Sequence, residues 1–170
     1  MSQLHESTIV MVDDNADEIF LTRRLVRRDG LLNRFVSENN PEHLFECLRE
    51  LEANGVNKSA IIILLDINMP RQNGFETLAL IRNSLEYYKT PVVMLSASMS
   101  EADKDMAMKL GANGYMVKPF SSDDLFMELK RVRGVKKKIL SNSDDHSEQS
   151  DIYDRVPAVP ANYPLKNQSG

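Results

Sequence analysis

The chain has 170 residues, with 21 Lys or Arg against 25 Asp or Glu, and its formal net charge is −4 at pH 7. An acidic chain lacks the basic surface that nucleic-acid phosphates require, so we do not expect direct binding to nucleic acid. Its single cysteine excludes an internal disulfide and a cysteine-rich metal site.

Five short apolar runs are predicted to form strands, and they alternate with amphipathic stretches that are predicted to form helices. The strands are expected at Thr8–Val12, Phe35–Ser37, Ala60–Leu65, Pro91–Leu95 and Gly114–Val117. Helix starts are indicated by Asn15, Asn40, Asn73, Ser100 and Ser121, and helix ends by Gly30, Gly55, Gly111 and Gly134. This alternation predicts an α/β fold, a doubly wound five-stranded parallel sheet with helices on both faces.

Charge and hydrophobic pattern both change near residue 135. Residues 1–135 carry 16 basic and 20 acidic side chains, whereas residues 136–170 carry five of each and three of the seven prolines. The second segment buries too little apolar surface to offset its ordering entropy. We therefore expect one domain over residues 1–135 and a disordered or linker-like tail over residues 136–170, too short for a DNA-binding domain.

No apolar run approaches the roughly 18 residues that a membrane helix needs. Residues 1–7 also lack the basic start of a secretory signal. We expect a protein that does not insert into membranes and that lies in the cytoplasm.

Polar side chains follow four of the predicted strands, at the edge where parallel α/β sheets bind ligands. They are Asp13 and Asp14 after the first strand, Asp66 after the third, Ser96 after the fourth and Lys118 after the fifth. Three carboxylates in one cleft repel one another unless a cation lies between them. Mg²⁺ suits this set, because it takes a few carboxylates and shares oxygens with a phosphate.

The same residues predict a phosphoryl site. Asp14, Asp66 and the backbone carbonyl of Asn68 are expected to bind Mg²⁺, with Asp13 acting through a water. Lys118 and Ser96 would offer a positive charge and a hydroxyl donor to phosphoryl oxygens. Any one of these residues alone is more often a turn, cap or surface residue, so the prediction depends on their joint occurrence at one edge.

Several sequence blocks resemble the signature blocks of bacterial response-regulator receiver domains. The blocks are Val12-Asp13-Asp14-Asn15, residues 64–70 with Asn73-Gly74, Leu95-Ser96-Ala97, and Gly111-Ala112 followed by Lys118-Pro119-Phe120. The resemblance covers about 130 residues. It implies a flavodoxin-like sheet in the order 2-1-3-4-5, Asp66 as phosphoacceptor, Asp13 and Asp14 as the acidic pair for Mg²⁺, Ser96 as switch hydroxyl, Lys118 as phosphate-sensing lysine and Tyr115 as aromatic switch.

The resemblance also implies a function. A single-domain response regulator accepts a phosphoryl group from a sensor histidine kinase or a histidine phosphotransfer protein, and it turns over no independent substrate. Phosphorylation would let Tyr115 turn inward and reshape the face of the fourth helix, fifth strand and fifth helix, which would then contact a partner or form a homodimer. Residues 14–18 and 85–90 are further similar to stand-alone receivers that serve phytochrome-type kinases.

Two alternatives stay open. The chain could be a phosphorelay intermediate that passes its phosphoryl group to a histidine phosphotransfer protein. It could also be a Mg²⁺-dependent small-molecule phosphohydrolase, but enzymes of the haloacid-dehalogenase type need a second Asp two residues after the nucleophile, where this chain has Asn68. No glycine-rich nucleotide-binding motif occurs.

Overall fold

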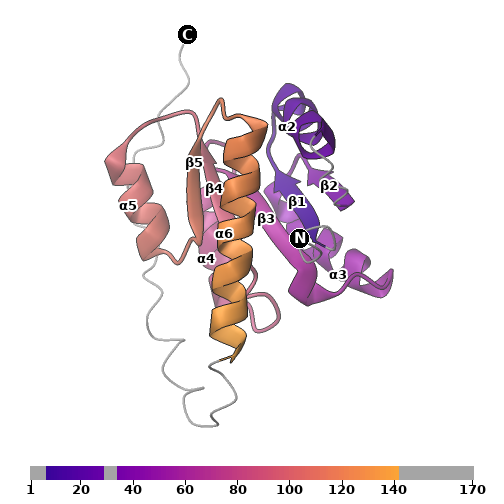
Figure 1. Ribbon diagram of the computed structural model, residues 1–170. Coiled ribbons are helices and arrows are strands. Elements are labelled where there is room, and N and C mark those ends of the chain that lie inside the picture. The colour runs from indigo at the N-terminus through magenta and orange to yellow at the C-terminus, as the bar shows by residue number, and fades with distance from the viewer. Residues whose placement is uncertain (1–6, 29–33, 142–170) are drawn as a thin grey trace.

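Five parallel strands form one sheet in the order β2-β1-β3-β4-β5, with helices on both sides (Figure 1). The computed structural model describes residues 7–28 and 34–141. The strands are β1 (Thr8–Val12), β2 (Arg34–Glu38), β3 (Ile61–Asp66), β4 (Val92–Ser96) and β5 (Gly114–Val117). The helices are α2 (Ala16–Arg28), α3 (Leu44–Ala53), α4 (Gly74–Asn83), α5 (Glu101–Lys109) and α6 (Ser122–Ser141), with short 3₁₀ helices η1 (Pro41–His43) and η2 (Lys58–Ala60). The predicted flavodoxin-like fold is confirmed.

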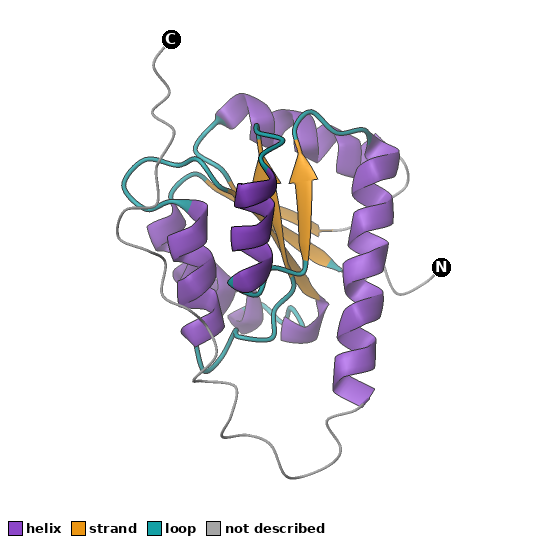
Figure 2. Ribbon diagram, turned by 90° about the vertical axis from the view of Figure 1, so that its left-hand side faces the viewer, coloured by secondary structure: helices purple, strands orange, loops and turns teal. Residues whose placement is uncertain are grey.

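Alternate residues of the central strands enter two separate hydrophobic cores. Val10 and Ile63 face a core that includes side chains from α3, α4 and α5. Ile9 and Ile62 face a second core with side chains from α2 and α6. Because side chains alternate across a strand, a sheet buried on both faces needs continuous apolar strands, as β3 has. Figure 2 shows the strands enclosed between these helices.

The predicted helix-start residues form side-chain caps, but Asn40 caps the 3₁₀ helix η1, and α3 begins at Leu44 without a side-chain cap. Asn15 Oδ1 accepts the N–H of Asp17, and Asn73 forms a capping box with Glu76 at the start of α4. Asn40, Ser100 and Ser121 accept backbone N–H groups in the same way. These caps satisfy donors that have no partner within the helix.

One predicted helix end is wrong. Gly55 and Gly111 follow α3 and α5 with φ of 83° and 89°, as expected, and Gly30 lies outside the described residues. Gly134, however, lies inside α6, which continues to Ser141. A helix-interior glycine costs only about 1 kcal/mol, and burial of Leu125, Leu129 and Val132 along the same helix outweighs that cost.

The expected domain boundary at residue 135 thus falls within a helix, and the part of the tail from residue 142 onward lies outside the described residues. Among the described residues, no helix is both long and apolar enough to cross a membrane.

Candidate phosphoryl-acceptor site

Two of the predicted site residues lie within strands, because β3 and β4 each end one residue later than predicted. Asp66 is the last residue of β3 and pairs with Leu95, and Ser96 is the last residue of β4 and pairs with Val117. The sequence pattern instead predicts that both residues follow their strands. The sheet ladder therefore fixes the backbone of Asp66 and Ser96, which makes the site more rigid than one carried on loops.

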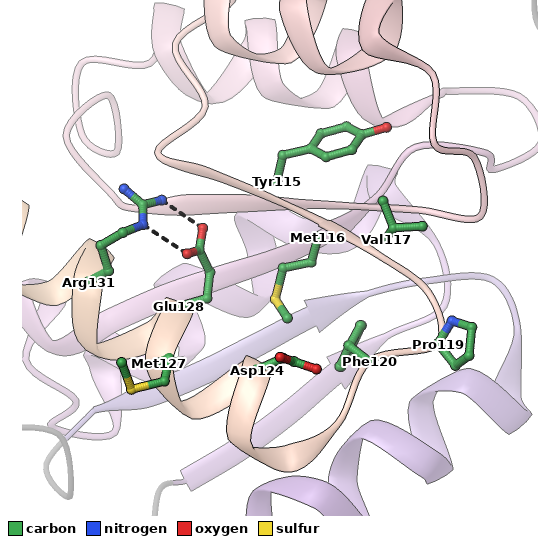
Figure 3. A pocket seen from close by; sticks show the side chains of 9 residues that line it. All are labelled: Tyr115, Met116, Val117, Pro119, Phe120, Asp124, Met127, Glu128 and Arg131. Carbon is green, nitrogen blue, oxygen red and sulfur yellow. Dashed lines mark hydrogen bonds and ion pairs between the residues drawn. The ribbon is translucent and has the colours of Figure 1, made fainter.

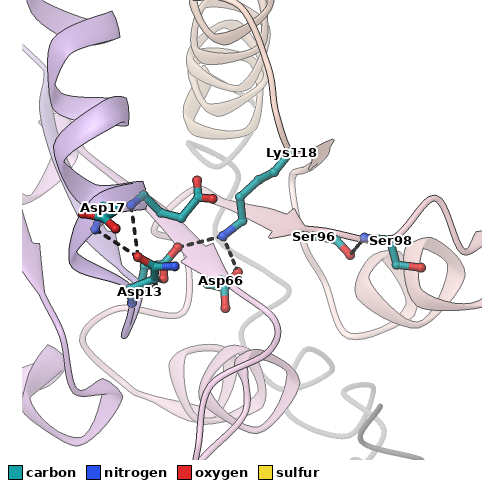
Figure 4. A network of polar contacts seen from close by, with 8 residues as sticks. Asp13, Asp17, Asp66, Ser96, Ser98 and Lys118 are labelled. Atoms are coloured by element: carbon teal, nitrogen blue, oxygen red, sulfur yellow. Dashed lines mark hydrogen bonds and ion pairs between the residues drawn. The ribbon is translucent and has the colours of Figure 1, made fainter. Parts of the chain in front are cut away.

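Lys118 joins the ends of β1 and β3. Its Nζ lies 2.8 Å from Asp13 Oδ2 and 2.8 Å from Asp66 Oδ1 (Figure 4). The Lys118 backbone N–H donates to the carbonyl of Ser96 at 2.7 Å, so the lysine continues directly from the β4–β5 ladder. The carboxylates of Asp13 and Asp66 are almost fully buried, at 1% and 6% exposure. One cation thus neutralises two buried carboxylates from separate strands.

Asp14 completes the acidic group from the solvent side. Asp13, Asp14 and Asp66 each place a carboxylate oxygen within 4.8 Å of the others, and Asp14 is exposed. Three oxygen donors, one of them open to solvent, fit a hard cation that keeps several waters, as Mg²⁺ does. The donor set of this chain is therefore compatible with the predicted Mg²⁺ site.

The site perturbs the ionisation of its own groups. Burial raises the pKa of Asp66 to about 6, the charges of Asp13 and Asp14 add to this, and Lys118 opposes it. Burial alone would lower the pKa of Lys118, but hydrogen bonds to Asp13 and Asp66 raise it above its usual range. Asp66 thus binds a proton more readily than an ordinary aspartate, while Lys118 stays charged.

Ser96 and Tyr115 are connected through Ser98. The buried Ser96 Oγ accepts the N–H of Ser98 at 3.0 Å, and the Tyr115 hydroxyl donates to the carbonyl of Ser98 at 3.2 Å. The Ser98 Oγ in turn accepts the N–H of Ser100, the residue that caps α5. The structure therefore places the two predicted switch residues in one chain of hydrogen bonds that leads from the site to α5.

The loop between β3 and α4 carries the remaining predicted site residue, Asn68, and two residues whose backbone constraints were not predicted, Arg71 and Gly74. Asn68, whose carbonyl is the predicted fourth ligand, is half-buried. Arg71 adopts φ of 70°, which is rare outside glycine. A Cβ on Gly74 would overlap the Asp66 carbonyl oxygen and lie 2.8 Å from Ile67 Cα. Only glycine fits there, and the Asn-Gly pair after Pro70 is the signal that could have assigned it this role.

Two grooves flank the site. The first runs between β5 and α6, as Figure 3 shows, and is lined by Tyr115, Met116, Val117, Pro119, Phe120, Asp124, Met127, Glu128 and Arg131. The second lies between α2 and the segment after β5, and its lining includes Leu21, Leu25, Phe120 and Lys118 itself. The second groove therefore reaches a residue that touches both buried carboxylates.

Known proteins with similar sequences show which family this chain resembles. The response regulator receiver domain family matches residues 9–130. Transcriptional regulatory protein CpxR from Escherichia coli K12 is 31% identical over 124 residues, 73% of this chain and 48% of that protein. Chemotaxis protein CheY1 from Helicobacter pylori is 30% identical over 129 residues, 75% of this chain and 97% of that protein. This chain spans about half the length of the CpxR proteins that it matches.

A solved structure is similar over most of the fold. The crystal structure of the phosphorylated cyanobacterial phytochrome response regulator RcpA has a TM-score of 0.59 and 28% sequence identity. The similarity covers 81% of this chain and 96% of that one.

Proposed function

The chain belongs to the response regulator receiver domain family, and on that premise we propose that it accepts a phosphoryl group on Asp66. The observation that carries the proposal is the contact of Lys118 Nζ with both Asp66 and Asp13 at 2.8 Å. Asp66 is a buried carboxylate at a strand end, with the Lys118 ammonium and the acidic pair Asp13 and Asp14 beside it. These are the groups that phosphoryl transfer needs.

In the proposed reaction, an Asp66 carboxylate oxygen attacks the phosphorus of a phosphohistidine on a partner protein. The new O–P bond forms as the N–P bond breaks, and its electron pair returns to the imidazole nitrogen. Lys118 and the Ser96 hydroxyl stabilise charge on the transferred oxygens. Mg²⁺ held by Asp13, Asp14, Asp66 and the Asn68 carbonyl would supply further positive charge there. Positioning and electrostatics do most of the work in such transfers.

The phosphodonor is proposed to approach along the groove between α2 and the segment after β5. Leu21 is 53% exposed and lines this groove together with Lys118, so an apolar side chain of the partner can pack there while its phosphohistidine faces Asp66.

The proposed phosphodonor is a sensor histidine kinase or a histidine phosphotransfer protein. The same contact would serve return of the phosphoryl group in a phosphorelay. The similarity to RcpA supports a phytochrome-type kinase as one such donor, and the cytoplasm is the compartment we propose for the transfer.

The output is proposed to pass through the face formed by α5, β5 and α6. When the Ser96 hydroxyl turns to the phosphoryl oxygens, its bond to the Ser98 N–H is given up. The Ser98 carbonyl also accepts a hydrogen bond from the Tyr115 hydroxyl. Movement of Ser98 would therefore release Tyr115 and change the groove that Tyr115 lines. This is a two-state element biased by a local change of charge. A partner protein or a second copy of the chain would bind one of the two states.

Beryllofluoride, which mimics a phosphoryl group on aspartate, tests the proposal directly. With Mg²⁺ present, we expect it to shift the NMR resonances of Asp66, Ser96, Tyr115 and Lys118, and Asp66→Asn to abolish these shifts. Absence of shifts in the wild-type chain would contradict the assignment. In a parallel assay we expect no phosphate release from small phosphomonoesters, because Asn68 cannot act as a general acid, and measurable turnover would instead support the phosphohydrolase alternative.

A further inference from the structure

Asn113, the residue before β5, holds both backbone polar groups of the residue that opens β4. Its N–H donates to the carbonyl of Val92 at 2.8 Å, and its side-chain Oδ1 accepts the N–H of Val92 at 2.9 Å. The β4–β5 ladder begins one residue later, where Val93 lies opposite Gly114. Asn113 therefore closes the end of the ladder that lies away from the site.

Arg82, near the end of α4, holds Asn113 in this position. Its Nη2 donates to the same Asn113 Oδ1 at 2.8 Å. The guanidinium also donates to the carbonyls of Gly111 at 2.8 Å, Tyr88 at 3.1 Å and Thr90 at 2.9 Å. All four acceptors are neutral oxygens, and burial lowers the pKa of Arg82 to about 10. Such a fork of donors fixes the side-chain amide of Asn113 and the two segments that lead into β4 and β5.

The register of β5 matters because Tyr115 lies within this strand and Lys118 follows its last residue, Val117. β5 has four residues and is paired on one side only, with β4. A slip of one residue would turn every side chain of a strand to the opposite face. At the site end, the Lys118 N–H donates to the carbonyl of Ser96 at 2.7 Å and extends the ladder by one bond beyond the strand.

We propose that Asn113, held by Arg82, is a positioning residue that fixes β5 against β4 and thereby places Lys118 and Tyr115. The inference rests on the proposed function, since it concerns how Lys118 meets a phosphoryl group. It makes a selective prediction, because the carboxylates of the Mg²⁺ site lie on or directly after β1 and β3. Among the described residues, the hydrogen bonds of Asn113 go to Val92, Arg82 and Arg131, none of which lies on β1 or β3. Loss of the Asn113 side chain should therefore weaken phosphoryl binding and spare Mg²⁺ binding.

The test is an NMR titration of the full chain with Mg²⁺ alone and then with beryllofluoride at saturating Mg²⁺. We expect Asn113→Leu to weaken beryllofluoride binding at least about tenfold, while its Mg²⁺ affinity stays within about threefold of wild type. Asn113→Asp keeps the Oδ1 acceptor for Val92 and Arg82, and we expect it to bind beryllofluoride as wild type does. Leu51→Ala in α3 is the control for general destabilisation, because Leu51 is buried in the core that faces α3, α4 and α5 and takes no part in the side-chain hydrogen bonds of Asn113 and Arg82.

The outcomes separate this inference from the proposed function. If the wild-type chain fails to bind beryllofluoride, the proposed function is wrong. If the wild type binds and Asn113→Leu binds equally well, or loses Mg²⁺ and beryllofluoride affinity together as a loosened fold would, the positioning role is wrong. Should Asn113→Leu not fold, Arg82→Lys takes its place, because a lysine cannot donate to four acceptors at once, and the same selective loss is expected.

Discussion

The Lys118 ammonium and the Asp66 carboxylate, 52 residues apart in the sequence, meet at 2.8 Å where β5 and β3 end at the same edge of the sheet. Asp13 accepts from the same ammonium at 2.8 Å. This arrangement prepares a positive charge beside the carboxylate that is proposed to carry the phosphoryl group.

Removal of the Lys118 ammonium should slow phosphorylation. Lys118→Met keeps an unbranched side chain but offers no charge to the phosphoryl oxygens, and we expect transfer from acetyl phosphate to fall about 100-fold. The rate is measured as the phosphorylated fraction by intact-protein mass spectrometry over time. Lys89→Met, which removes an exposed lysine from the loop before β4, is the matched control and should react as wild type does. Equal rates for the two variants would show that Lys118 has no part in the transfer.

The raised pKa of Asp66 makes stability depend on pH in metal-free protein. The folded state binds the Asp66 proton more tightly than the unfolded state does. Protonation of Asp66 therefore adds to the free energy of unfolding, fully below pH 4, and this stabilisation is lost as pH rises through about 6. Asp66→Asn removes the ionisation, and we expect it to exceed wild type in unfolding free energy by about 2 kcal/mol at pH 7.5 and much less at pH 4.5. Urea denaturation in EDTA at the two pH values measures this. If the wild type were more stable than Asp66→Asn at pH 7.5, burial would not disfavour the charged form of Asp66, and the assignment would be contradicted.

Gly74 and Gly134 form a pair of opposite predictions. Gly74→Ala forces a Cβ onto the Asp66 carbonyl, so we expect a loss of at least about 2 kcal/mol in unfolding free energy and slower phosphorylation. Gly134→Ala adds a Cβ with nothing within 4 Å, inside α6, and should gain about 0.5–1 kcal/mol. Thermal and urea unfolding compare the two. Destabilisation by Gly134→Ala would mean that α6 does not continue through this residue.

The groove between α2 and the segment after β5 should matter for a protein donor only. We expect Leu21→Glu to reduce transfer from a histidine kinase that phosphorylates the wild-type chain at least about tenfold, because it places a charge where an apolar contact is proposed. Transfer from acetyl phosphate, which needs no docking, should be unchanged. Leu85→Glu alters an exposed leucine outside the groove and is the matched control. An equal loss of transfer from the kinase and from acetyl phosphate would mean that Leu21 supports the fold and does not contact the donor protein.

The fold and the centre of the site could be predicted because their signals are local. The unbroken apolar run of β3 and the Asn73 cap are each contained in a few residues, and the rule that parallel strands end at one edge brings Asp13, Asp66 and Lys118 together. The Asn15 and Ser121 caps were predicted from the same kind of signal.

Other features depend on packing that no short pattern encodes. Arg82 and Asn113 are 31 residues apart and meet only because α4 ends beside the segment that leads into β5. Gly134 has the local signal of a helix end, yet α6 continues past it, because burial of Leu129 and Val132 in the preceding turns stabilises the helix. Asp66 and Ser96 belong to their strands because neighbouring strands supply ladder partners, which polarity alone could not indicate.

The most direct test of the central claim locates the phosphoryl group. The chain is incubated with acetyl phosphate and Mg²⁺, the acyl phosphate is reduced with borohydride, and the modified residue is identified by peptide mass spectrometry. We predict one modified residue, Asp66, with no modification in EDTA or in Asp66→Asn. Modification of another residue, or label that persists in Asp66→Asn, would contradict the account.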